Sequence, residues 1–181
     1  GNLKLNIPPQ TSTIGSHLPK SVGLAVSITR ARELGIKSIY DKDSIVVCSF
    51  GDASYNHATS QTAINAAEWL SYTNYPLPIV FVCEDNELGI SVRTPRAWIE
   101  HSCKSKKSIH YVQTDGLNIA DVYEKGKIAQ ELCRRKRQPV FLHLKCTRLL
   151  GHGGADIETT YRSLEDIEES TEYFAKKKAK K

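Results

Sequence analysis

Short apolar segments alternate along the chain with longer amphipathic ones. The short segments are rich in Val and Ile, as buried strands are, and they span residues 44–50, 78–83, 109–113 and 140–146. Apolar residues recur with helical spacing in the longer segments, which span residues 18–34, 57–71 and 118–136. Because strand and helix alternate, the pattern predicts an α/β fold with a mostly parallel sheet and crossover helices on both faces, in three layers.

We expect one domain, because 181 residues with 40% hydrophobic content bury a single sizeable core. A lead-in segment without periodicity covers residues 1–16, and the α/β domain covers residues 17–162. Residues 163–181 are predicted to form a helix that begins at a Ser163 cap and ends in a lysine tail. Since the chain has no methionine and opens with glycine, we expect a processed chain or a fragment of a longer one.

Composition narrows the class of protein. The net charge of +5 equals the five lysines of the tail, so the rest of the chain is balanced and a general nucleic-acid surface is not supported. No apolar run approaches the length of a membrane-spanning helix. The five cysteines are odd in number and form no CxxC pair, which predicts buried free thiols in a reducing compartment.

Two predicted strands end in the same way. The stretch "IVVCSFGDAS" runs into Gly51 and Asp52, and "FVCEDNELG" runs into Asp85 and Asn86. Because ligands of parallel α/β sheets bind outside the carboxyl ends of the strands, we expect Asp52 and Asn86 to lie in neighbouring loops. Their oxygens suit a magnesium or calcium ion that keeps other positions for a phosphorylated ligand. The alternative is that both residues only form turns or cap helices.

The backbone at the first strand end is suited to phosphate. Gly51 allows a close approach of the main chain to phosphate oxygens, and the amides of Ala53 and Ser54 are placed to donate to them. The two strand ends together predict a site for a metal ion and a diphosphate.

These motifs resemble a known family. Gly51-Asp52-Ala53, followed after about thirty residues by Asp85-Asn86, is similar to the thiamine diphosphate motif G-D-G then N-N. With "FGDASYNHATSQTAINAAEWL", "LPIVFVCEDNELGIS" and "LKCTRLLGHGGADIETTYRS", the chain resembles the α subunit of the first component of 2-oxo acid dehydrogenase complexes. "STIGSHLPKSVGLA" is similar to the branched-chain (2-oxoisovalerate) members especially. The likeness runs from about Thr11 to Glu169 and implies a thiamine diphosphate-binding fold.

The resemblance implies a site for thiamine diphosphate and Mg²⁺. The metal would be held by two side chains and one main-chain carbonyl, those of Asp52, Asn86 and Leu88. The diphosphate and the aminopyrimidine end of the cofactor would be contacted by Gly51, Ala53, Ser54, Ser12 and Ile14.

The same resemblance makes His152 the active-site histidine of a glycine-rich loop over the cofactor. Asp156, Tyr161 and Arg162 are implied to hold the conformation of this loop, although Arg162 could equally be a surface ion-pair partner. Gly153 stands where many relatives carry a phosphorylatable serine, so we expect no phosphorylation there.

Two residues depart from the family pattern. Ala53 replaces a glycine, which is unfavourable if that position needs a positive φ. Asp85 replaces an asparagine and adds negative charge near the expected diphosphate. The remaining histidines show no metal-ligand spacing and receive no role: His17, His57, His101, His110 and His143.

The function predicted from the resemblance is the diphosphate-binding half of an oxidoreductase. Such an enzyme decarboxylates a branched-chain 2-oxo acid oxidatively and transfers the acyl group to a lipoyl acyltransferase partner. A β subunit or β domain would supply the pyrimidine-side residues, in a heterotetramer, so this chain alone is expected to have little or no turnover. The expected compartment is the bacterial cytoplasm or the mitochondrial matrix.

Two other functions stay open at this stage. One is a transketolase-like enzyme with the same cofactor. The other is a binding module that has kept the fold without catalysis and contacts acidic partners through its lysine tail. The sequence does not identify the acyl side chain of the substrate.

Overall fold

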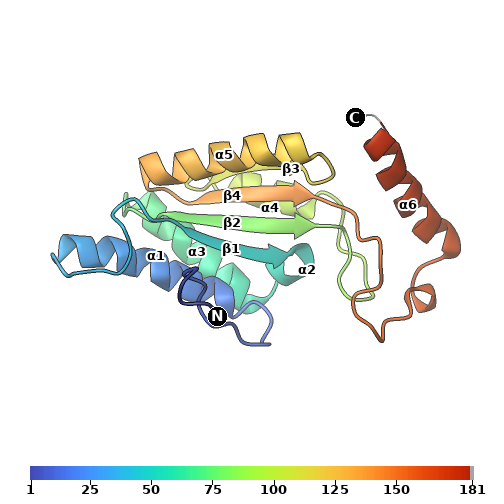
Figure 1. The fold of residues 1–181 in the computed structure, drawn as a ribbon, viewed down its shortest axis with the longest axis horizontal. Helices are drawn as coiled ribbons and strands as arrows, with labels where there is room; N and C mark the ends of the chain where they lie inside the picture. The colour runs from blue at the N-terminus through green and yellow to red at the C-terminus, as the bar shows by residue number, and fades with distance from the viewer. Residues whose placement is uncertain (180–181) are drawn as a thin grey trace.

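The computed structural model describes residues 1–179, with side chains through residue 175. The end of the predicted lysine tail, Lys180 and Lys181, lies outside the described residues. Four strands form one sheet in which every pairing is parallel, as predicted (Figure 1). In spatial order they are β1 (Val46–Gly51), β2 (Ile79–Asp85), β4 (Val140–Lys145) and β3 (His110–Asp115).

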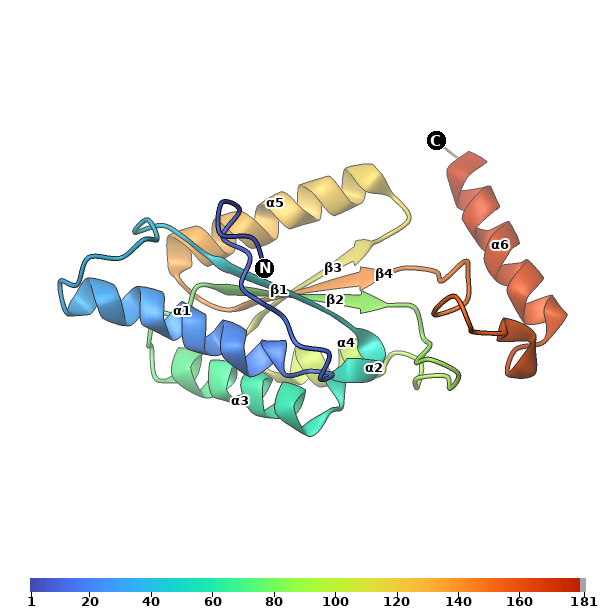
Figure 2. The same cartoon turned by 60° about the horizontal axis from the view of Figure 1, so that its bottom comes forward.

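Helices cover both faces of the sheet, which confirms the three-layer prediction (Figures 1 and 2). One face carries α1 (His17–Glu33), α3 (Ala58–Tyr72) and α4 (Trp98–Ser105), and the other carries α5 (Ile119–Lys136). The short α2 (Asp52–Tyr55) follows β1 directly, and α6 (Leu164–Ala179) follows the 3₁₀ turn Glu158–Thr160.

Capping residues set several helix ends where the sequence predicts them. The Asn118 side chain accepts hydrogen bonds from two N–H groups in the first turn of α5. The Ser163 hydroxyl accepts one from the N–H of Asp166 at the start of α6. Gly35 follows α1 with φ +65°, the left-handed conformation in which helices commonly end. α2 and α4 are not predicted from the sequence, because they are too short to show a helical period.

Strand side chains alternate between two cores because successive residues point to opposite faces. Phe81 and Cys83 pack with α1, α3 and α4, whereas Val80 packs with α5. α5 lies over β2, β3 and β4, and Val47 on the corresponding face of β1 is 63% exposed. Polar strand residues that lie two positions from Phe81 or Cys83 therefore point to the same face of the sheet, the one covered by α1, α3 and α4.

An aromatic cluster joins the strands on this face. Phe141 of β4 is 1% exposed, and its ring centroid lies 6.0 Å from those of Phe50 and Tyr55. The rings of Phe81 and Tyr111 lie 6.5 Å and 6.4 Å from it. The cluster thus connects all four strands with α2.

The state of the cysteines and the apolar character of the helices can be compared with what the sequence predicts. All five cysteines are free, and burial raises the pKa of Cys103 and of Cys133 to about 12, so these thiols stay protonated. Among the described residues, no helix combines the length and the apolar character that crossing a bilayer requires.

The aromatic cluster generates a stability prediction. Phe141→Ala should lower the free energy of unfolding by about 3–5 kcal/mol, because it empties the centre of the cluster. Urea unfolding followed by circular dichroism measures the loss. The matched control is Tyr123→Ala on α5, where the side chain is 75% exposed and the change should stay within about 0.5 kcal/mol. Equal losses in the two variants would contradict the assignment of Phe141 to the core.

Candidate functional site

The ends of β1 and β2 bring Asp52 and Asn86 together. Gly51 of β1 lies opposite Glu84 of β2, so the chain enters two adjacent loops at one edge of the sheet. Asp52 is 2% exposed, its carboxylate accepts a hydrogen bond from the Thr94 hydroxyl, and the main-chain N–H of Asn86 lies near enough to lower its pKa. The neighbouring loops predicted from the strand pattern are therefore in direct contact.

The surroundings of Asp52 disfavour the ionised form of its carboxyl group. Burial raises the pKa of the Asp52 carboxyl above its ordinary range, and the charge of Asp85 adds to the rise. The hydrogen bond from Thr94 and the main-chain N–H groups oppose the rise without cancelling it. A divalent cation would stabilise the ionised form, so this carboxylate is suited to binding one.

The loop of residues 86–96, here called the Asn86 loop, begins with two consecutive side-chain turns. Asp85 Oδ1 accepts the N–H of Glu87 at 3.1 Å, and Asn86 Oδ1 accepts the N–H of Leu88 at 2.9 Å. Glu87 has φ +59°, and Leu88 then pairs with Arg93 across the narrow loop. These turns fix the main chain at Leu88, whose carbonyl is the third oxygen in the predicted ligand set.

The conflict expected at Ala53 does not arise. Ala53 lies in the helix α2 and is not among the residues with positive φ, so its Cβ causes no backbone strain. A Cβ added at Gly51 would meet no atom within 4 Å, which leaves open space beside the end of β1. A Cβ added at Gly89 would lie 3.5 Å from that of Ala53, so the Asn86 loop packs on the start of α2.

The lead-in segment reaches the same end of the sheet (Figure 2). Gly15, at φ +73°, packs so closely on the start of α3 that an added Cβ would come within 2.8 Å of the Ser60 hydroxyl. The His17 ring bonds to the carbonyl of Ser49 in β1 at 2.9 Å. Ser12 and Ile14 are exposed on the lead-in turn that these contacts hold.

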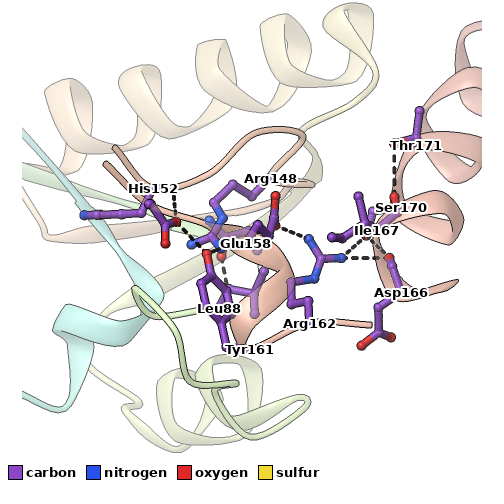
Figure 3. A network of polar contacts seen from close by, with 12 residues as sticks. Leu88, Arg148, His152, Glu158, Tyr161, Arg162, Asp166, Ile167, Ser170 and Thr171 are labelled. Carbon is purple, nitrogen blue, oxygen red and sulfur yellow. Dashed lines mark hydrogen bonds and ion pairs between the residues drawn. The ribbon is translucent and has the colours of Figure 1, made fainter. Parts of the chain in front are cut away.

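The segment between β4 and α6, residues 146–163, is here called the histidine loop. The main-chain N–H of His152 donates to the Asp156 carboxylate at 2.6 Å, and the Tyr161 hydroxyl donates to the same carboxylate. The hydrogen bonds from Tyr161 and from the His152 N–H lower the pKa of Asp156, which keeps this acceptor ionised. Figure 3 shows the exposed His152 side chain extending away from this network.

Arg148 joins the histidine loop to the Asn86 loop, and the sequence analysis assigned it no role. Its Nη1 donates to the carbonyls of Gly89 at 2.8 Å and Ile90 at 3.0 Å, and its Nη2 donates to the Tyr161 hydroxyl at 2.7 Å (Figure 3). Its side chain is 12% exposed. The signal for it in the sequence is an arginine shortly after the end of a third parallel strand, at the same sheet edge.

Arg162 is buried at 7% exposure, so it is not a surface ion-pair partner. It pairs with the Glu158 carboxylate, and its Nη2 donates to the Asp166 carbonyl at 2.8 Å and to the Ser170 hydroxyl at 2.6 Å. Glu158 lies 3.5 Å from Arg148 as well, so the two arginines share one carboxylate. Arg162 thereby fixes the start of α6 to the histidine loop.

Asn86 and Leu88 also line a cavity of about 320 Å³ on the side that faces β4 and α6. Basic and acidic side chains both reach it, among them Arg93, Lys145 and Asp166. Asp52 does not line this cavity, so the cavity lies beside the contact between the two loops and does not enclose it.

Comparison with known proteins identifies the family of this chain. Residues 3–179 match the family described as "Dehydrogenase E1 component". The chain belongs to this family. It is 28% identical over 158 residues to the mitochondrial pyruvate dehydrogenase E1 component subunit alpha of Dictyostelium discoideum, covering 85% of this chain and 37% of that protein.

Two further relatives show how general the match is. A testis-specific pyruvate dehydrogenase E1 alpha subunit of Homo sapiens is 33% identical over 129 residues, 70% of this chain and 32% of that protein. The mitochondrial 2-oxoisovalerate dehydrogenase subunit alpha 2 of Arabidopsis thaliana is 27% identical over 171 residues, 93% of this chain and 33% of that protein. Pyruvate and 2-oxoisovalerate relatives match about equally, so the branched-chain type is not specifically favoured. The chain spans about a third of the length of these relatives.

Solved structures confirm the predicted fold. The transketolase of Campylobacter jejuni superposes with a TM-score of 0.60 at 18% identity, over 91% of this chain and 26% of that one. A transketolase of Leishmania mexicana gives 0.59 at the same identity, over 91% and 25%. At this identity the likeness concerns the fold alone.

The raised pKa of Asp52 predicts a stability gain on neutralisation. Because the pKa is higher in the folded than in the unfolded state, the ionised carboxylate costs stability at neutral pH. Asp52→Asn should therefore raise the melting temperature of the ligand-free protein at pH 7 by about 3 °C. The gain should vanish as the pH falls below about 3.9, the unfolded value, because wild-type Asp52 is then protonated in both states. Asp43→Asn, whose side chain is 72% exposed, is the control and should leave the melting temperature unchanged.

The contacts of Arg148 predict that the histidine loop depends on it. Arg148→Gln should speed amide hydrogen exchange across residues 151–161 by at least about tenfold, because it removes charged hydrogen bonds to Tyr161 and to two carbonyls. Mass spectrometry of peptic fragments measures the exchange. Arg134→Gln on the exposed face of α5 is the control, and similar exchange in both variants would refute the role of Arg148.

Proposed function

We propose that this chain is the diphosphate-binding half of a thiamine diphosphate-dependent 2-oxo acid dehydrogenase. The observation that carries the proposal is the contact between Asp52 and Asn86 at adjacent strand ends, in a chain that belongs to the dehydrogenase E1 component family. The pyruvate and 2-oxoisovalerate dehydrogenase subunits among its relatives support the class of substrate.

The residues present fit Mg²⁺ with a diphosphate. Asp52 offers a buried carboxylate whose ionised form a cation would stabilise, and Asn86 offers a carboxamide oxygen with a second lone pair beyond its bond to Leu88 N–H. Within residues 1–179 no group of three His, Cys, Asp or Glu side chains forms a metal site. The remaining ligands would be the Leu88 carbonyl, diphosphate oxygens and water, as is usual for Mg²⁺.

The open space at Gly51 would receive the diphosphate, and the amides of Ala53 and Ser54 would donate to it. When bound, thiamine diphosphate supplies the carbanion chemistry by which a 2-oxo acid loses carbon dioxide. The lead-in turn with Ser12 and Ile14 would face the aminopyrimidine end. His152, exposed on a loop whose main chain Asp156 holds, would act on the substrate side.

The partners belong to the same proposal. A β subunit or β domain would complete the pyrimidine side of the site, and a lipoyl acyltransferase would accept the acyl group. The substrate is a small 2-oxo acid, with the branched-chain type as the more specific form of the proposal on the likeness of "STIGSHLPKSVGLA". The relatives are named as mitochondrial, and the compartment proposed for this chain is the mitochondrial matrix or the bacterial cytoplasm, both of which suit the free thiols.

A melting experiment with the cofactor tests the proposal. Thiamine diphosphate with Mg²⁺, at about 100 times its Kd, should stabilise the protein by roughly 2.7 kcal/mol and raise the melting temperature by about 5–10 °C. Chelation with EDTA should reverse the shift. Asp52→Asn should abolish it, whereas Asp43→Asn at the opposite end of β1 should keep it. The protein is measured alone and co-expressed with the β portion, and no shift in either form at millimolar cofactor contradicts the proposal.

An activity panel separates the proposal from a transketolase-like enzyme. The protein with its β portion is assayed with 2-oxo acids and an artificial electron acceptor, and in parallel with sugar phosphates. Turnover of 2-oxo acids is expected. Turnover of sugar phosphates alone would favour the transketolase-like function over the dehydrogenase.

A further inference from the structure

A chain of buried polar side chains lies directly beneath the Asn86 loop. His143 of β4 is fully buried, and its Nε2 lies 2.7 Å from Asp85 Oδ2 at the end of β2. Its Nδ1 lies 2.6 Å from the hydroxyl of Tyr111 in β3. Both nitrogens of a histidine without access to solvent are therefore engaged, as the cost of burying an unpaired polar group requires.

The parallel register explains why these three side chains meet. His143 lies opposite Cys83 of β2 and Gln113 of β3, so Asp85 and Tyr111 each stand two residues from its partner position. Residues two apart on a strand share a face, and diagonal neighbours on adjacent strands are within reach of long side chains. No role for His143 is predicted from the sequence, because its partner Asp85 is distant in the chain.

The Asp85 carboxylate contacts both His143 and the Asn86 loop. Its Oδ2 meets the His143 ring while its Oδ1 accepts the N–H of Glu87, the residue with φ +59°. One carboxylate thus holds the turn from which Asn86 and Leu88 are presented. A non-glycine residue with positive φ needs such support, because the conformation is intrinsically unfavourable.

The charge of Asp85 is balanced inside the core. Burial by itself would raise the pKa of this carboxyl, but the hydrogen bond from His143, the N–H of Glu87 and the charges of His143 and Lys145 outweigh it and hold the pKa below the ordinary range. The Asp85 carboxylate, at 6% exposure, faces the His143 ring.

We propose that His143 is a positioning residue of the candidate cofactor site, which it serves by anchoring the Asp85 carboxylate that fixes the turn at Glu87. It touches neither the metal nor the diphosphate, and it sets how well Asn86 and Leu88 are placed to bind them. The proposal rests on the proposed function for its ligand, whereas its effect on the loop belongs to the ligand-free protein.

The required chemistry explains why a histidine stands here. Asp85 needs a buried hydrogen-bond donor, and the Tyr111 hydroxyl, which is also 3.1 Å from Gln113 Oε1, needs a second partner. The two ring nitrogens of one imidazole serve as partners for both groups. Leucine at this position would leave a buried carboxylate without its donor, which is strongly unfavourable, whereas glutamine would keep one N–H donor.

The test compares His143→Leu and His143→Gln with Leu77→Ala. Leu77 is fully buried just before β2, at the far end of the sheet, so its truncation lowers stability by about 2–5 kcal/mol without touching the loop. The first measurement is amide hydrogen exchange at Glu87 and Leu88 in the ligand-free protein. The second is the affinity for thiamine diphosphate with Mg²⁺.

We expect His143→Leu to speed exchange at Glu87 by at least about tenfold, the change that losing about 1.4 kcal/mol produces. We expect cofactor affinity to fall by a similar factor, with His143→Gln intermediate in both measurements. Leu77→Ala should change exchange at Glu87 no more than its loss of global stability requires.

Three results would overturn the proposal: unchanged exchange at Glu87 in His143→Leu, an affinity within about twofold of wild type, or the same local effect in Leu77→Ala. If the wild-type protein binds no cofactor at all, the proposed function fails. The exchange at Glu87 then still decides whether His143 fixes the loop.

Discussion

The parallel pairing of β1 with β2 is the constraint on which the site depends. It sets Gly51 opposite Glu84, so two loops leave one edge of the sheet side by side. Burial then makes the contact specific: the Asp52 carboxylate, withdrawn from water, accepts a hydrogen bond from the Thr94 hydroxyl of the neighbouring loop. A site formed from strand ends in this way has its oxygens held by the sheet, while the loops above them carry the exposed groups.

The arginines extend this order to segments outside the sheet. Arg148 binds main-chain carbonyls of one loop and the Tyr161 hydroxyl of another, and Arg162 continues the network to α6 through Glu158 and Ser170. The planar guanidinium suits this task because it presents several donors in fixed directions. His152 is thus carried by a loop whose main chain is held at both ends, although its own side chain lies exposed.

The parallel sheet, the long helices and the meeting of the Asp52 and Asn86 loops could be predicted because they follow from local patterns. Asn118 caps its own helix within three residues, and strand ends of one parallel sheet share an edge whatever the packing. Arg148 and His143 could not be predicted, because their partners lie far away in the chain and are selected by register. α4 was missed for a different reason: it has eight residues and begins after Ala97 in the left-handed conformation, which no period reveals.

The position of β1 has a thermodynamic meaning for the whole domain. It is one of the two edge strands of the sheet, and Val47 on one of its faces is exposed, so the strand that leads to Asp52 has fewer neighbours than the one that leads to Asn86. A ligand held jointly by both loops would connect the edge strand β1 to β2, which lies inside the sheet. Local opening of this edge strand and release of the ligand would then be a single linked event, and occupancy would protect β1 against opening.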